Sequence, residues 1–110
     1  MDPTNINQFY KRDNKYILNY KYGEYYDTTY ELLIFSESGA LLKKKVILGE
    51  FVMDSNNNII VNNKKNDLIE YYDINGDLLK TVSYTRPKSA QKRLVKQIKI
   101  DSADNVYFGQ

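Results

Sequence analysis

The chain contains no cysteine and no histidine among its 110 residues. Without cysteine it has no disulfide framework, no thiol nucleophile and no thiolate-bound metal. Without histidine it lacks the side chain that most often serves as a general base near neutral pH, and also the most common metal ligand. Cysteine and histidine supply many catalytic and metal-binding groups, and the Ser, Lys and acidic residues form no recognised catalytic or phosphate-binding motif. We therefore expect a protein that is not an enzyme and that uses neither metal nor cofactor.

Long hydrophobic runs are also missing. No apolar stretch approaches the roughly 20 residues that span a bilayer, and the opening "MDPTNINQFYKRDNKY" has neither the basic nor the apolar region of a secretory signal. We therefore expect no membrane partner and, by default, a cytoplasmic protein. Hydrophobic residues make up 42% of the chain and charged residues 27%, as in folded globular proteins. Its length suits one folded domain over residues 1–110.

The segments that remain have the patterns of β-strands. In "KYILNYKY" (15–22), Tyr16, Leu18, Tyr20 and Tyr22 alternate with Lys15, Asn19 and Lys21, which predicts a half-buried strand. "TTYELLIFS" (28–36) is β-branched and aromatic, and "ESG" (37–39) separates it from the apolar "ALLKKKVIL" (40–48). These segments predict antiparallel hairpins.

A second hairpin repeats the first. "NDLIEYYDINGDLLKTVSY" (66–84) carries Asn75 and Gly76 at its tip, which predicts a type I′ turn because both residues tolerate positive φ. Laying residues 32–44 over 69–81 aligns Gly39 with Gly76, and "DSNNNIIV" (54–61) aligns with "DSADNVYF" (101–108). "KRDNKYIL" (11–18) matches the same pattern more weakly. The chain therefore contains internal repeats, and the repeating unit is about two hairpins long.

An Asp followed by a short polar turn, an apolar run, a polar loop, "YDINGD" and a final strand resembles the repeat of NHL-type and related six-bladed β-propellers. In that family one such unit forms a four-stranded blade of roughly 40 to 50 residues. The resemblance covers about residues 9–110 and implies blade strands at 51–53, 59–61, 68–72 and 78–84. It implies a preceding blade near 8–48 and half a following blade from 98 to 108.

The resemblance supplies about two and a half blade-like units, whereas a propeller closes with at least about four blades. The chain is then part of a larger propeller, or assembles with copies of itself, or forms a plain β-meander. From the residues we expect an all-β protein of antiparallel hairpins. A small closed β-barrel or β-sandwich is the alternative.

The Asp-rich segments invite a metal interpretation that their spacing does not support. "DSNNN" (54–58) begins like a calcium-binding EF-hand loop, but Ile59 stands where Gly is required and Lys65 where a bidentate Glu belongs. Asp and Asn at turns bond to their own backbone and tolerate left-handed conformations. We interpret 54–58, 73–77 and 101–105 as turns.

One segment is strongly basic. "RPKSAQKRLVKQIK" (86–99) has six basic residues and no acidic one, in a chain whose net charge is only +2. It has the character of an inserted loop, with a short helix at most around 88–97, and basic loops contact acidic partners, nucleic acid included. Its candidate partner-binding residues are Arg86, Lys88, Lys92, Arg93 and Lys96.

Seven of the eleven tyrosines lie between Tyr10 and Tyr30. Most have the spacing of strand residues and are expected to pack, but Tyr25 and Tyr26 stand in "GEYYDTT" (23–29), which we interpret as an exposed loop. Tyrosine suits protein partners and sugars. We expect a binding or assembly module that recognises another protein, either as part of a propeller-like platform or as a small stand-alone inhibitor or escort of a larger protein. Nucleic-acid binding through 86–99 and lectin-like sugar binding through 20–30 are the alternatives. Unblocked strand edges near Phe9 and in 106–108 favour a homo-oligomer.

Overall fold

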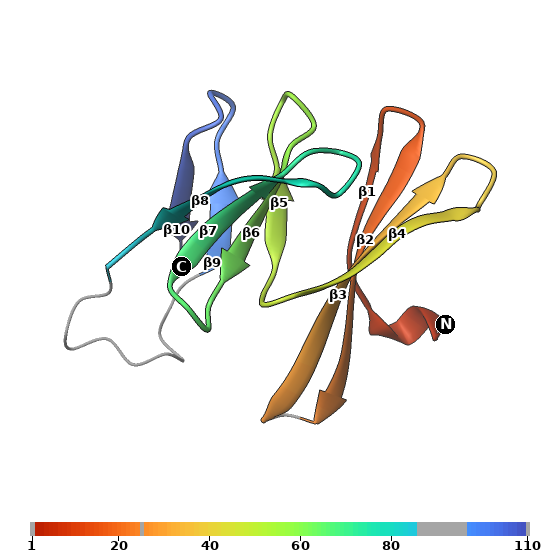
Figure 1. Cartoon of the computed structure of the whole chain (residues 1–110), viewed down its shortest axis with the longest axis horizontal. Coiled ribbons are helices and arrows are strands. Elements are labelled where there is room, and N and C mark those ends of the chain that lie inside the picture. Colours follow the sequence, from red (N-terminus) through yellow and green to blue (C-terminus); the bar gives the residue numbers. More distant parts are fainter. Residues whose placement is uncertain (1, 25, 86–96, 110) are drawn as a thin grey trace. The chain divides into compact units, whose positions relative to one another are not determined.

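A computed structural model describes residues 2–24, 26–85 and 97–109. Figure 1 shows that these residues form antiparallel β-strands joined by hairpins, so the expected all-β class is confirmed. The chain divides into two compact units, residues 1–47 and residues 48–110. Each unit is described in turn.

The first unit is a four-stranded meander in the order β1-β2-β3-β4, preceded by a short 3-10 turn (Figure 1). Its β-branched and aromatic composition favours strands, and every neighbouring pair is antiparallel. The elements are η1 (Pro3–Asn5), β1 (Ile6–Arg12), β2 (Lys15–Glu24), β3 (Asp27–Ser36) and β4 (Leu41–Ile47).

The second unit contains a four-stranded meander, β5-β6-β7-β8, and a separate hairpin of β9 and β10. Val52, Ile60 and Ile69 of the sheet are buried together with Ile98 of the hairpin, so an apolar cluster joins the two. The strands are β5 (Phe51–Met53), β6 (Ile59–Asn63), β7 (Leu68–Tyr72), β8 (Leu78–Ser83), β9 (Gln97–Ile100) and β10 (Val106–Gly109). In the described residues each of the three sheets keeps two edge strands, so none closes into a barrel.

Three turns of the second unit have the same hydrogen bonds. The carboxylate of Asp54 accepts the backbone N–H groups of Asn56 and Asn58 at 2.9 and 2.8 Å. Asp73 and Asp101 accept the corresponding N–H groups in their own turns. In each segment the Asp carboxylate thus bonds to the backbone of its own turn, and this confirms the interpretation of the three segments as turns. The fourth residue of each turn has a positive φ: Asn57, Gly76 and Asp104.

The predicted type I′ turn at Asn75 and Gly76 is wrong. Only Gly76 has a positive φ there, at 84°, and its N–H bonds to the carbonyl oxygen of Asp73 at 2.9 Å. The Asp73 carboxylate also holds the N–H of Asn75, which favours a three-residue turn that ends in a left-handed residue. The two-residue turn with both φ values positive lies instead between β1 and β2, at Asp13 and Asn14.

Two further expectations for the first unit need correction. Segment 23–29 is not an extended loop, because β2 runs to Glu24 and β3 begins at Asp27. Gly23 adopts φ 106° beside Thr28, a conformation that keeps the strands paired up to the tip. Asn19, predicted on a solvent-facing side, is fully buried, so β2 is covered on both faces at its centre. Among the described residues, no helix is long and apolar enough to cross a bilayer.

Candidate protein-binding surface

The two faces of the β1–β4 sheet differ in exposure. One face carries Ile17, Leu32, Ile34 and Ile47, which are all at most 2% exposed. The residues that alternate with them point to the opposite side. We call this second side the open face, and it carries the following side chains: Phe9, Tyr16, Leu18, Tyr20, Glu31, Leu33, Phe35, Leu41, Lys44 and Val46.

Large apolar side chains remain exposed at the rim of the open face. Phe9 is 57% exposed, Leu41 52% and Val46 59%. Leu18 and Leu33 lie at its centre and are buried beneath their neighbours. Single exposed apolar residues are ordinary on protein surfaces, but three of them bordering one sheet face make that face a candidate interaction surface.

A groove of about 380 Å³ runs across the open face, lined mainly by apolar atoms. Glu31, 7% exposed, contributes its only acidic side chain, and Lys44 lies 3.5 Å from that carboxylate. Apolar walls with one charged pair are typical of a pocket that receives a single anchoring side chain of a partner. Its remaining lining residues are Tyr20, Leu33, Phe35 and Leu41.

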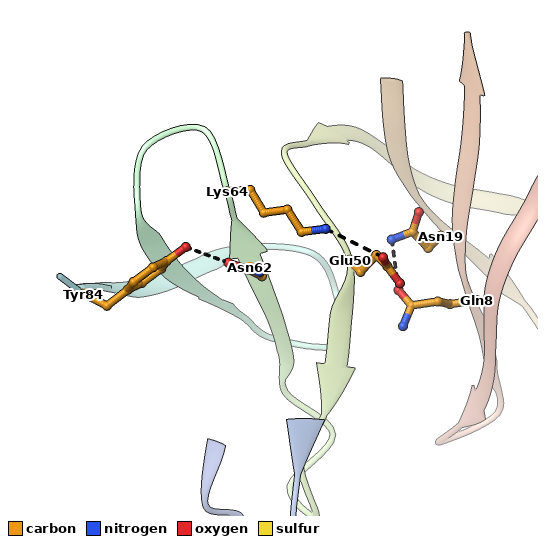
Figure 2. Close-up of polar contacts among 6 residues, drawn as sticks. All are labelled: Gln8, Asn19, Glu50, Asn62, Lys64 and Tyr84. Carbon is orange, nitrogen blue, oxygen red and sulfur yellow. Dashed lines mark hydrogen bonds and ion pairs between the residues drawn. The ribbon is translucent and has the colours of Figure 1, made fainter. Parts of the chain in front are cut away.

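The buried face of the same sheet is held by a polar contact. The Asn19 side-chain N–H donates to Oε1 of Gln8 at 3.0 Å, between neighbouring strands (Figure 2). A buried amide that is hydrogen-bonded in this way favours one strand register over its neighbours.

A second hollow, of about 570 Å³, lies at the end of the first unit near the tyrosine-rich hairpin. Tyr22 and Tyr30 line it from β2 and β3, and Lys21 lies with its Nζ 5.7 Å from the centre of the Tyr30 ring. Amide and hydroxyl side chains complete the wall. They belong to Thr4, Asn5, Asn7 and Thr28.

The residues expected from the sequence to bind a partner are not brought together by the described structure. Tyr26 is 87% exposed at the tip between β2 and β3. Tyr25 lies outside the described residues. So do residues 88–96 of the predicted helix region, whose last residue, Gln97, begins β9. The five basic candidates also lie outside the described residues: Arg86, Lys88, Lys92, Arg93 and Lys96.

The open face was missed by the sequence analysis, although part of its signal was visible. The alternation of Tyr16, Leu18 and Tyr20 marks one side of β2 correctly as aromatic and apolar. Nothing in that alternation says whether a neighbouring sheet covers the side. Phe9 and Val46 also lie on strands whose place at the sheet edges emerges only from the pairing.

Polar contacts in the second unit serve the fold. The Tyr84 hydroxyl donates to Oδ1 of the buried Asn62 at 3.1 Å, and Lys64 lies 3.8 Å from Glu50 (Figure 2). Burial and the adjacent Glu70 carboxylate raise the pKa of Tyr72 to about 12, so this phenol stays neutral and donates to Glu70 at 3.2 Å.

Two turns of the same unit are also tied together. The Ser55 backbone N–H donates to Oδ1 of Asp104 at 2.9 Å, and the Ser55 hydroxyl contacts the other carboxylate oxygen. In the neighbouring turn, hydrogen bonds from Asn105 and Ala103 hold the pKa of the Asp101 carboxyl below its ordinary value. The Ser55–Asp104 bonds hold the turn of hairpin β9–β10 against the turn between β5 and β6.

The described geometry therefore singles out an apolar sheet face and a polar hollow beside it. Comparisons with protein-family models, with curated proteins and with solved structures found no match to this chain.

Proposed function

We propose that the chain is a non-enzymatic binding and assembly module that recognises another protein through the open face. The carrying observation is the contrast between the two faces of one sheet. The apolar residues of the buried face are at most 2% exposed, whereas Phe9, Leu41 and Val46 are each more than half exposed.

Covering the open face is energetically favourable. Burying one exposed Phe, Leu or Val side chain is worth about 1.5–3 kcal/mol, so a few such residues dominate the affinity of an interface. The groove beside Glu31 adds specificity, because its little-exposed carboxylate favours a partner that places a hydrogen-bond donor there. The surface thus combines exposed apolar side chains, which supply affinity, with the Glu31 carboxylate, which supplies specificity.

Affinity capture from an extract of the source cells tests this proposal. Val46→Asp places a charge at the rim of the open face, where the partner would cover it, and we expect it to lower recovery of the specific partner at least about tenfold, because a buried unpaired charge is strongly unfavourable. Leu79→Asp is the matched control, since Leu79 is 55% exposed on β8 of the other sheet. Identical recovery by the wild type and both variants contradicts recognition through the open face.

Sugar binding is a second candidate function, and the hollow at the tyrosine-rich hairpin favours it. The Tyr30 ring, with amide and hydroxyl groups around it, offers the kinds of side chain that contact the apolar and polar sides of a sugar ring. In this second proposal the contact is made by Tyr30, and the lining residues do not include the exposed Tyr26.

Titration with an oligosaccharide panel separates the two functions. If the hollow binds sugar, Tyr30→Ala should weaken binding about tenfold or more, as the loss of one stacking ring does, and Tyr26→Ala should leave it unchanged. Binding should also change little between low and high salt, since uncharged ligands are not screened. No binding to any member of the panel, or equal loss from both variants, contradicts a site in this hollow.

A further inference from the structure

The second unit contains an interface between a sheet and a hairpin. Ile98 of the hairpin is 6% exposed and is clustered with Val52 and Ile60 of the β5–β8 sheet. Ile100 and Val106 pack against the same cluster. The inner side of hairpin β9–β10 thus sits on one face of a four-stranded sheet.

Strand register shows which residues of the first unit correspond to this inner side. Ile98 pairs with Phe108 across the hairpin, just as Phe51 pairs with Val61 across β5 and β6. In the first unit the corresponding cross-strand pair is Phe9 with Leu18, both on the open face. The open face therefore corresponds to the inner side of hairpin β9–β10, which is the side that packs on the β5–β8 sheet.

The outward side of the hairpin is the surface that would come next in such a stack. Tyr107 is 48% exposed there and pairs with Lys99, whose methylene chain lies over Gly109. Tyr107 occupies the position that corresponds to Ile60, the residue of the sheet that contacts the hairpin. The exposed Tyr107 thus lies at the position where Ile60 of the β5–β8 sheet contacts the hairpin.

We infer that two copies of this chain associate head to tail, with the outward side of hairpin β9–β10 of one copy seated on the open face of the next. This inference rests on the proposed function and names its partner as a second copy. It extends an interface already present within the chain, so no new type of contact is needed. The surfaces differ from one another, so the contact is heterologous and leaves one free surface at each end.

The side chains on the two surfaces suit each other. The groove of about 380 Å³ is lined by apolar groups, with the Glu31 carboxylate as a hydrogen-bond acceptor, and Tyr107 offers a ring and a hydroxyl donor. The same pairing occurs within the chain, where the Tyr72 hydroxyl donates to Glu70. Lys99 on the outward side is a long side chain whose ammonium group can reach the Glu31 carboxylate, which Lys44 approaches at 3.5 Å from the other side of the groove.

Mixing two complementary variants tests the inference by sedimentation velocity over a hundredfold dilution. Phe9→Asp blocks the open face and leaves the hairpin intact, whereas Tyr107→Asp does the reverse. We expect wild-type chains to associate with rising concentration and each variant alone to stay near 12.9 kDa. An equal mixture should form a complex of two chains that grows no further, because one intact surface of each kind remains. Leu79→Asp should associate as the wild type does.

Two other outcomes overturn the head-to-tail arrangement. If Tyr107→Asp associates like the wild type while Phe9→Asp is monomeric, the open faces pair with each other, and the proposed recognition surface stands without the hairpin. If the wild type is monomeric at every concentration, self-association is wrong, and the capture experiment alone decides the proposed function. Circular dichroism checks folding, and Val46→Asp and Lys99→Glu replace either variant that fails to fold.

Discussion

Replacing Ile60 with alanine should lower the free energy of unfolding by about 2–5 kcal/mol, the usual cost of removing most of a buried aliphatic side chain. Ile60 is 1% exposed and lies in the cluster that joins the β5–β8 sheet to Ile98. The cavity would lie between the sheet and hairpin β9–β10, so amide hydrogen exchange in the hairpin should accelerate as well. Urea unfolding measures the first effect, and exchange read by mass spectrometry measures the second.

Val82→Ala is the matched control for Ile60→Ala. Val82 belongs to β8 and is 46% exposed, so its truncation should change stability by no more than about 0.5 kcal/mol. If the two variants unfold at the same urea concentration, Ile60 is not part of a packed core. If Ile60→Ala loses stability but hairpin exchange is unchanged, the hairpin is held by its turn contacts alone.

Changing Gly49 to alanine should destabilise the second unit by about 3 kcal/mol or more, because the added methyl has no space. A Cβ on Gly49 would lie 1.9 Å from the carbonyl oxygen of Asn62, and that oxygen belongs to the backbone. The chain on either side is fixed, since Asn62 N–H bonds to the Glu50 carbonyl at 2.9 Å and Lys64 N–H to the Leu48 carbonyl at 3.1 Å. One of these backbone pairs must open to admit the methyl.

Gly39→Ala separates steric conflict from backbone conformation. Gly39 has φ 94°, but nothing lies within 4 Å of the position that an added methyl group would occupy, so only the left-handed conformation opposes alanine. That cost is about 1 kcal/mol. Thermal or urea unfolding should therefore rank Gly49→Ala well below Gly39→Ala in stability. Equal losses would mean that the 48–50 segment moves freely away from β6.

The strand positions that the propeller resemblance implied for the second unit agree with the structure to within two residues. The predicted segments 51–53 and 68–72 match β5 and β7, and 59–61 falls short of β6 by two residues. Turn chemistry explains this accuracy, because Asp, Asn and Gly at the strand ends bond to the local backbone and need no distant partner. The all-β class and the repeated turns are local properties of the same kind.

The turn type at Gly76 and the strand ends near Gly23 were harder to predict. Asn75 and Gly76 suit a type I′ turn, but the Asp73 carboxylate holds the N–H of Asn75 and selects another turn. The Asn-Gly pair and the preceding Asp73 favour different turn types over the same residues, so residue preferences alone did not decide the turn type. Cross-strand pairing likewise carried β2 and β3 through a segment rich in loop-forming residues.

The open face depended on tertiary structure. Alternation along β2 assigns Leu18 and Asn19 to opposite sides of the strand and predicts that the Leu18 side is the covered one. In the folded chain Asn19 is fully buried whereas Phe9, beside Leu18, is 57% exposed. A sequence period reports which residues share a face, but burial depends on whether other parts of the chain pack against that face. Strand pairing and packing in the folded unit determine that burial, so only the tertiary structure shows which apolar side chains stay exposed.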